Sequence, residues 1–156
     1  MSYRSPYGSQ GFDFADRLTP GVRNLIMANG IVFLVQALFG NGALERILGL
    51  VPNAVFAQFH VWQLVTYMFL HGGLLHLLFN MLALFMFGSE VEREWGTPEF
   101  LKYYFFTGAG AGVTQWAMNM GSGIPTIGAS GAIFGLLLAF GMMFPNRPVL
   151  LYFILP

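Results

Sequence analysis

Residues 130–144, SGAIFGLLLAFGMMF, form an apolar stretch without a charged side chain, and Arg147 follows soon after its end. As a helix this stretch would be about 22 Å long, several ångströms short of the ~30 Å hydrocarbon core of a bilayer. Because Arg147 holds the inner end at the surface, the outer end at Ser130 is expected to lie below the opposite surface. Irregular backbone at that depth is tolerated only where it is buried in protein or lines a wet cavity. We therefore expect Ser130 to face water inside the bilayer.

Three further apolar stretches precede this one, at residues 22–39, 70–88 and 100–118. Each is long enough to cross a bilayer as a helix. A short amphipathic stretch at residues 44–51 is typical of a helix that lies in the membrane interface. The sequence therefore predicts an all-α fold, a polytopic transmembrane helical bundle.

The chain is expected to form one membrane domain, residues 22–156, after a polar cytoplasmic arm, residues 1–21. The arm mixes charged residues with glycine and proline and has no apolar core, so it is not a signal peptide. A fifth span begins at residue 149, and only eight residues remain, which are too few to cross a membrane. We therefore expect a partial domain, truncated within its fifth span.

The composition excludes several classes of function. Hydrophobic residues make up 56% of the chain and charged residues only 9%, against roughly 25% charged residues in soluble domains. The net charge is zero, which gives no basis for nucleic-acid binding. The absence of cysteine excludes disulfides and thiol catalysis. Three histidines without clustered carboxylates make a poor metal site, so neither a metal nor another cofactor is expected.

The basic residues predict the orientation in the membrane. With a cytoplasmic N-terminus, six of them lie on the cytoplasmic side: Arg4, Arg17, Arg23, Arg93, Lys102 and Arg147. Only Arg46 lies outside, and this bias follows the positive-inside rule. Trp95 then falls at the inner interface, where an aromatic belt is expected. The polar arm and the lack of a transit signature favour a bacterial inner membrane, with the lipid bilayer as a partner and the site around Ser130 open to the outer side.

Three polar side chains occur where hydrocarbon is expected: His71, His76 and Asn80. His76 and Asn80 are four residues apart and therefore share one face of a helix. His71 lies near the outer end of that helix, beside two glycines. Intramembrane polar groups are costly and usually face the bundle interior, where they either serve a site or form hydrogen bonds between helices.

The segment GASGAIFG, residues 128–135, has the residue types of a serine nucleophile site. Ser130 opens a helix, whose first N–H groups have no internal partner and attract negative charge. An oxyanion formed by attack of Ser130 on a carbonyl would meet those donors, and His76 and Asn80 could add more. Gly128 and Gly131 leave room for a peptide backbone. The alternative is a small-residue packing seam, since residues 131 and 135 form a GxxxG pair.

Three segments taken together, HGGLLHLLFN (71–80), EREWG (92–96) and GASGAIFG (128–135), resemble the rhomboid family of intramembrane serine proteases. The resemblance implies that Ser130 is the nucleophile and that His76, Asn80 and the Ser130 N–H stabilise the oxyanion. It implies further roles in the binding site, in a structural turn and in packing against the last core helix. The residues of the binding site would be Gly128, Ala129, Gly131 and His71, with His71 in a water-accessible cavity above the site. The structural turn would contain Glu92 and Gly96. The residues that pack against the last core helix would be Gly131 and Gly135.

One departure from the family pattern concerns the general base. Rhomboids use a Ser–His dyad whose histidine lies on a sixth core helix, whereas His60, His71 and His76 all precede Ser130. A serine hydroxyl is a poor nucleophile without a neighbouring base. We therefore expect the complete protein to hydrolyse peptide bonds in or near transmembrane segments of membrane proteins, and the 156-residue chain alone to be inactive.

Two other functions stay open at this point. A non-catalytic rhomboid-like protein that binds transmembrane clients would need no base. A small channel or transporter is disfavoured, because the predicted spans contain no Asp or Glu and no inverted repeat.

Overall fold

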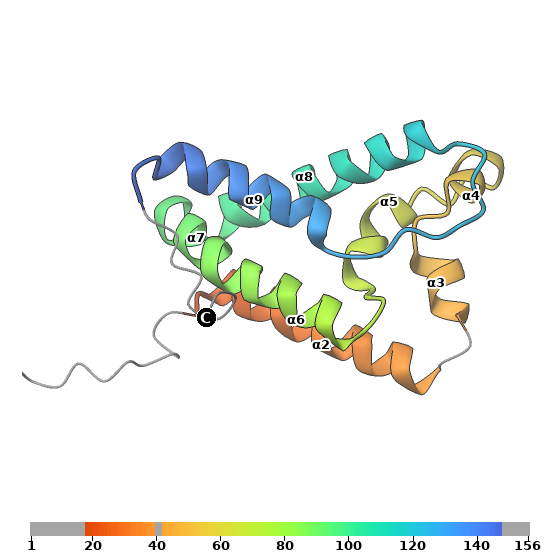
Figure 1. Ribbon diagram of the computed structural model, residues 1–156, viewed down its shortest axis with the longest axis horizontal. Helices are drawn as coiled ribbons and strands as arrows, with labels where there is room; N and C mark the ends of the chain where they lie inside the picture. Colours follow the sequence, from red (N-terminus) through yellow and green to blue (C-terminus); the bar gives the residue numbers. More distant parts are fainter. Residues whose placement is uncertain (1–17, 40–41, 148–156) are drawn as a thin grey trace, which may run out of the picture.

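The computed structural model describes residues 18–39 and 42–147, which form helices joined by short loops (Figure 1). No β-strand occurs in these ranges, where an isolated bridge between Leu50 and Thr126 is the nearest approach to one. The predicted all-α fold is therefore confirmed. The predicted fifth span, from residue 149, and residues 1–17 of the predicted arm lie outside the described residues.

The bundle is built from four long rods: α2 (Pro20–Leu38), a continuous rod of α6 (Leu74–Ala83), η2 (Leu84–Gly88) and α7 (Ser89–Trp95), α8 (Thr97–Met118), and α9 (Ser130–Met143). Three of them match the predicted spans to within three residues. The second rod is longer than predicted, because the polar residues after Gly88 continue the helix as far as Trp95.

The short elements gather at one end of the bundle (Figure 1). They are α3 (Ala43–Leu48), α4 (Pro52–Ala57), α5 (Gln63–Thr66) and η1 (Tyr67–Phe69). The fully buried Gln63 organises this end. Its amide nitrogen donates to the carbonyls of Arg46 (3.1 Å) and Ile47 (3.2 Å), and its oxygen accepts from the Val51 N–H (3.0 Å). The amphipathic stretch predicted at 44–51 is thus a short helix that Gln63 ties to α5.

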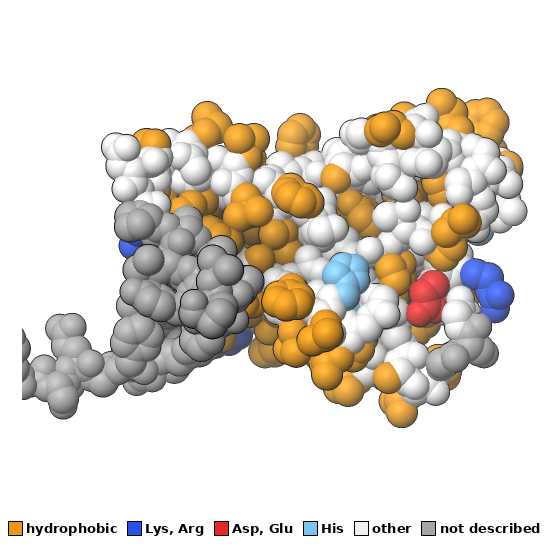
Figure 2. Space-filling view, in the orientation of Figure 1, with side chains coloured by type: hydrophobic (Ala, Val, Ile, Leu, Met, Phe, Trp, Pro, Cys, Tyr) orange, Lys and Arg blue, Asp and Glu red, His pale blue; other side chains and the backbone are white. Residues whose placement is uncertain are grey.

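By length and composition, α2 and the rod Leu74–Trp95 can each cross a membrane. The apolar α9 has 14 residues, or about 21 Å, and is shorter than a bilayer core, as predicted. The 22 residues of α8 reach about 33 Å, but glycine, threonine and tyrosine lower its hydropathy. Hydrophobic side chains are spread across the outer surface, among few charged ones (Figure 2).

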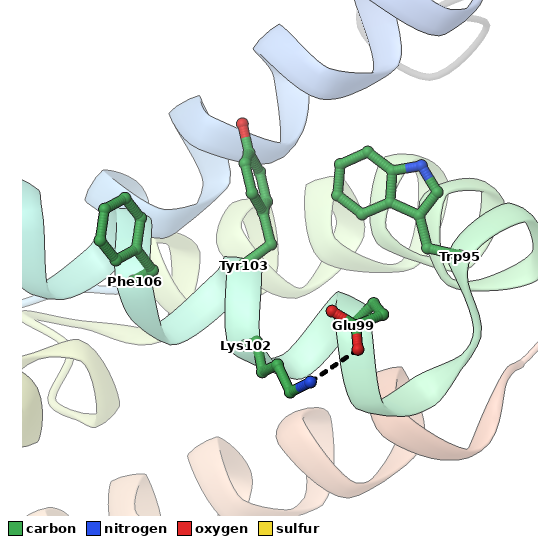
Figure 3. Close-up of a pocket in the computed structure, with 5 residues that line it drawn as sticks. All are labelled: Trp95, Glu99, Lys102, Tyr103 and Phe106. Atoms are coloured by element: carbon green, nitrogen blue, oxygen red, sulfur yellow. Dashed lines mark hydrogen bonds and ion pairs between the residues drawn. The ribbon is translucent and has the colours of Figure 1, made fainter.

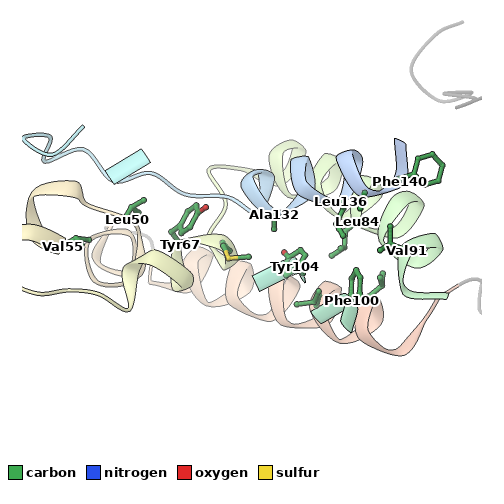
Figure 4. Packing of buried hydrophobic residues seen from close by; sticks show 14 residues of the cluster. Leu50, Val55, Tyr67, Leu84, Val91, Phe100, Tyr104, Ala132, Leu136 and Phe140 are labelled. Atoms are coloured by element: carbon green, nitrogen blue, oxygen red, sulfur yellow. The ribbon is translucent and has the colours of Figure 1, made fainter. Parts of the chain in front are cut away.

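The buried hydrophobic cluster takes residues from all four rods and from the short elements (Figure 4). Phe100 and Tyr104 of α8 are fully buried there, beside Leu84 and Leu136. In a water-soluble protein, burial of one aromatic or leucine side chain contributes roughly 1.5–3 kcal/mol to the free energy of folding. In lipid this term is lost, and the stabilisation comes from close packing. Close packing is therefore what the small residues of α8 and α9 have to provide.

Gly131 and Gly135 provide this close packing against α8. A Cβ on Gly131 would lie 2.6 Å from the Cβ of Ala111, and one on Gly135 would lie 2.6 Å from the Cβ of Thr107. The last core helix lies outside the described residues, so the expectation that these glycines pack against it stays a prediction. Their face of α9 is already occupied by α8, because small residues let two helix backbones approach closely.

Glu92 joins the ends of three helices at the opposite end of the bundle from α3–α5. This buried carboxylate of α7 accepts hydrogen bonds from the N–H groups of Gly21 (2.7 Å) and Val22 (2.9 Å), in the first turn of α2. It also accepts from the hydroxyls of Thr19 and Thr97, the latter at 2.6 Å. A carboxylate is favourable there, because the first N–H groups of a helix have no internal partner.

Gly96 makes the sharp turn between α7 and α8. Its φ of 79° lies in the left-handed region that glycine adopts without strain. Its N–H donates to Glu92 O (2.8 Å) and its carbonyl accepts from Phe100 N–H (3.1 Å), so it ends one helix and begins the next.

Candidate active site

Ser130 is the first residue of α9, and the fully buried Ala129 caps the helix. The Ser130 residue is exposed, and within residues 18–39 and 42–147 its hydroxyl forms no hydrogen bond. The first N–H groups of α9 have no partner inside the helix and carry partial positive charge. The hydroxyl is therefore free to react at a helix end that attracts negative charge.

The loop of residues 119–129, which leads into Ser130, is bound through its backbone to three other segments. Leu50 and Thr126 exchange two hydrogen bonds, of 3.0 and 2.8 Å. The Asn53 N–H donates to Ser122 O (3.0 Å), and the Gly128 N–H donates to Tyr67 O (2.9 Å). These hydrogen bonds satisfy backbone groups of the loop within the protein, which is the condition for irregular backbone to be tolerated inside a membrane.

Tyr67 accepts a hydrogen bond from the loop through its backbone carbonyl and was not identified from the sequence. It is buried, and its hydroxyl donates to Gly108 O (2.9 Å) on α8. A Cβ on Gly131 would lie 2.9 Å from the same hydroxyl oxygen. A buried tyrosine hydroxyl needs a partner, but nothing in the local sequence indicates that this partner is on α8.

Gly128 is the point where His76 and Ser130 approach each other. A Cβ on Gly128 would lie 2.8 Å from Cε1 and 2.9 Å from Nε2 of His76, and 3.7 Å from Oγ of Ser130. The φ of Gly128 is 126°, which side chains of L-residues rarely allow. The imidazole edge and the serine hydroxyl therefore border the same small space, from which any larger residue is excluded.

The hydrogen bond of His76 Nδ1 sets the direction of its ring. Nδ1 accepts from the Gly72 N–H (3.3 Å), so in the neutral imidazole the proton resides on Nε2. The Nε2–H group is thus a donor on the side of the ring that meets Gly128. This arrangement suits the stabilisation of negative charge near Ser130 better than removal of the serine proton.

Asn80 lies one turn further along α6, on the same face as His76. It is buried, and its amide nitrogen donates one hydrogen bond to His76 O (2.8 Å), while the second N–H has no acceptor among the described residues. α6 packs against α9. The structure thus brings His76, Gly128 and Ser130 together, with Asn80 behind His76 on the same helix.

His71 is enclosed: only 2% of its surface is exposed, and neither ring nitrogen has a hydrogen-bond partner among the described residues. Its ring meets the His76 ring edge-on, with centroids 5.1 Å apart. The structure therefore places His71 against His76 and away from the surface, whereas the prediction put it in an open, water-accessible cavity.

Gln36 of α2 holds the backbone of His71 and was also not identified from the sequence. Its oxygen accepts from the His71 N–H (3.0 Å), and its nitrogen donates to His71 O (3.3 Å) and to the Glu45 carboxylate (2.9 Å). Its position as a polar residue in the last turns of an apolar span could have identified it from the sequence.

No group of three or more histidine, cysteine or acidic side chains comes together in the described parts of the chain. The chemistry that the arrangement supports is attack by a hydroxyl on a carbonyl, with hydrogen-bond donors around the resulting oxyanion.

Comparison with known proteins identifies the family of the chain. Residues 58–156 match the model of the Rhomboid domain. The rhomboid protease GluP of Bacillus subtilis is 38% identical over 107 residues, which are 67% of this chain and 20% of GluP. RHOMBOID-like protein 5 of Arabidopsis thaliana is 34% identical over 128 residues, or 81% of this chain and 38% of that protein.

The B. subtilis protein YdcA is 31% identical over 150 residues, which cover 89% of this chain and 71% of YdcA. The chain thus spans a fifth of GluP and about two fifths of RHOMBOID-like protein 5. The matched domain includes the His76–Asn80 face, the Glu92–Gly96 turn and the Ser130 segment, and the chain therefore belongs to the rhomboid family of integral membrane proteins.

Proposed function

We propose that this chain carries the nucleophile of an intramembrane serine protease, which hydrolyses peptide bonds in or near transmembrane segments of other membrane proteins. The observation that carries the proposal is the meeting of His76 and Ser130 across Gly128, at the start of the short helix α9. A packing seam alone would not need an exposed serine at a helix start with an imidazole donor beside it.

In the proposed reaction, Oγ of Ser130 attacks the substrate carbonyl carbon as a base takes the hydroxyl proton. The negative charge that forms on the carbonyl oxygen is stabilised by the Ser130 N–H, the Nε2–H of His76 and the free N–H of Asn80. The base then gives its proton to the leaving amine, and the acyl group stays on Ser130 Oγ. Water attacks this ester as the base takes a proton from the water, and the base returns that proton to Ser130 Oγ when the carboxylic acid product leaves.

The base itself is assigned to a histidine outside these 156 residues, as in the Ser–His dyad of the family. Two observations support this assignment. All three histidines of the chain precede Ser130, and the tautomer of His76 directs its Nε2–H, which cannot accept a proton, toward the serine side. The proposal includes a bacterial inner membrane, a cytoplasmic N-terminus and a site open to the outer side, in agreement with the positive-inside bias.

A non-catalytic rhomboid-like protein that binds transmembrane clients is the second candidate. One observation favours it: among the described residues no imidazole forms a hydrogen bond with the Ser130 hydroxyl. Such a protein would keep the fold and a client-binding surface without needing a base.

A chimera separates the two candidates. In it, the chain is joined after Pro156 to the C-terminal segment of a rhomboid protease that carries the histidine helix. It is reconstituted in liposomes with a fluorogenic transmembrane substrate. The chimera should cleave the substrate, Ser130→Ala should abolish cleavage, and Ser122→Ala, in the loop before α9, should not. The 156-residue chain alone should show no cleavage that depends on Ser130.

Two outcomes would contradict the proposal. Undiminished cleavage by the Ser130→Ala chimera would remove Ser130 from the mechanism. If the 156-residue chain alone cleaved the substrate with Ser130, one of its own three histidines would be the base. A chimera that folds, binds the substrate and never cleaves it would favour the non-catalytic candidate.

A further inference from the structure

A cavity lies at the junction of α7 and α8, at the far end of α8 from the loop that leads to Ser130 (Figure 3). Its volume is about 630 Å³, and it is lined by Trp95, Glu99, Lys102, Tyr103 and Phe106. Four of these residues follow one another at helical spacing along a single face of α8. The cavity opens to the outside of the bundle, and it has no part in the chemistry proposed for Ser130.

The lining changes from charged to apolar along α8. Glu99 and Lys102 lie near its N-terminal end and form an ion pair of 2.6 Å, with 61% and 71% of their side chains exposed. Phe106 lies one turn further along, with 78% of its surface exposed. In the proposed orientation, the ion pair is at the cytoplasmic interface and Phe106 points into the hydrocarbon. The cavity therefore offers charged groups to a lipid headgroup at one end and an apolar surface to an acyl chain at the other.

The two charges are complementary to a zwitterionic headgroup. Lys102 can donate to a lipid phosphate, and Glu99 can accept from a lipid ammonium group, in place of the exposed bond that they share. That bond is weak, because both ends are solvated. Charged side chains and aromatic rings at the interface are the groups that recognise lipid headgroups.

The aromatic residues decide between an ethanolamine and a choline headgroup. The rings of Trp95 and Tyr103 pack edge-on, with centroids 5.1 Å apart at 88°, and the Tyr103 hydroxyl donates to Gly135 O (3.0 Å). Recognition of a quaternary ammonium uses open ring faces that surround it. Here the Trp95 and Tyr103 rings pack against each other and do not surround a common space. A primary ammonium that donates to Glu99 therefore fits the cavity better than a quaternary ammonium.

We propose that this cavity binds a phosphatidylethanolamine molecule of the cytoplasmic leaflet. Its phosphate lies on Lys102, its ammonium on Glu99, and an acyl chain runs past Phe106. The proposal rests on the orientation given above and not on the catalytic role of Ser130, so either can fail without the other.

Trp95 provides a local probe for the test. In the whole chain with Trp62→Phe and Trp116→Phe, Trp95 is the remaining tryptophan, and bromine on a nearby acyl chain quenches its fluorescence. The chain is reconstituted in vesicles with equal mole fractions of phosphatidylethanolamine and phosphatidylglycerol, with one or the other brominated. A second series replaces phosphatidylglycerol with phosphatidylcholine. Circular dichroism of each variant checks the fold.

Phosphatidylethanolamine should associate with the Trp95 site about 3-fold more strongly than either other lipid, the preference expected from one exposed charge pair. Glu99→Gln should remove this preference. The matched control Glu94→Gln, an exposed carboxylate beside Trp95 that does not line the cavity, should retain it.

Three results would overturn the proposal. Equal quenching by all three lipids would show ordinary annular contact. A preference for phosphatidylglycerol that is insensitive to Glu99→Gln would show a simple cationic patch around Lys102. A preference for phosphatidylcholine over phosphatidylethanolamine would show recognition by the aromatic rings instead of by Glu99.

Discussion

The imidazole of His76 lies so close to Gly128 that a Cβ atom on that glycine would be 2.9 Å from Nε2. The φ of Gly128, 126°, adds a second reason why only glycine fits. The approach of His76 to Ser130 therefore depends on a residue without a side chain.

Gly128→Ala should lower kcat of the chimera by about 10²-fold, because displacement of reacting groups by about an ångström has an effect of this size. The measurement is the cleavage rate of the transmembrane substrate at saturation. Gly121→Ala in the same loop is the control, since a Cβ there meets nothing within 4 Å. Full activity of the Gly128→Ala chimera would mean that the close approach to His76 has no function.

Asn80→Ala should reduce kcat by ~10²–10³-fold, the usual effect of losing one oxyanion donor. Slow labelling of Ser130 by a fluorophosphonate should persist, because Asn80 assists the reaction without starting it. Asn119→Ala is a matched control, since the Asn119 amide donates to Gln115 O (3.1 Å) in the same local pattern but at the end of α8. Equal rates for the two variants would exclude Asn80 from the oxyanion site.

Glu92→Gln should lower the free energy of unfolding by about 1.5–3 kcal/mol, the range for hydrogen bonds to a charged group. The substitution removes the charge that the N–H groups of Gly21 and Val22 face, and it leaves a single acceptor oxygen. Thermal unfolding in detergent, followed by circular dichroism, measures the change. The exposed Glu94→Gln should have almost no effect, and the same loss from both variants would rule out a specific role for Glu92.

Gly135→Ala and Gly141→Ala should change stability in opposite directions, although both lie in α9. A Cβ at position 135 would lie 2.6 Å from Thr107, so overpacking should destabilise the chain by about 1–3 kcal/mol. At position 141 a Cβ meets nothing within 4 Å, so alanine should stabilise the helix by roughly 0.5–1 kcal/mol.

A double-mutant cycle with Thr107→Gly tests the cause of the Gly135→Ala effect. Removing the Cβ of Thr107 should recover much of the loss, which would appear as a favourable coupling energy between the two positions. Additive effects would mean that the two residues do not limit the distance between α8 and α9.

Local sequence patterns were sufficient to predict most of the helices of this molecule. The apolar runs predicted most ends of the four rods to within a few residues. Such runs form helices because a helix satisfies its own backbone hydrogen bonds in lipid. The start of α9 at Ser130 also followed from local sequence. The exception was the end of the second rod, where polar residues after Gly88 did not end the helix. Its end at Gly96 depends on a left-handed backbone conformation there.

Contacts between distant segments were decided by the tertiary structure alone. Gln36 of α2 binds the backbone of His71, Leu50 pairs with Thr126, and the Tyr67 hydroxyl donates to Gly108 O. The sequence determined that residues 131 and 135 form a close-packing face, but not that this face meets α8. Helical spacing shows which residues share a face, whereas the partner of that face depends on how the rods pack as a whole. For the same reason the sequence determined that His76 and Asn80 point the same way, and only the packing of α6 against α9 brought His76 to Ser130.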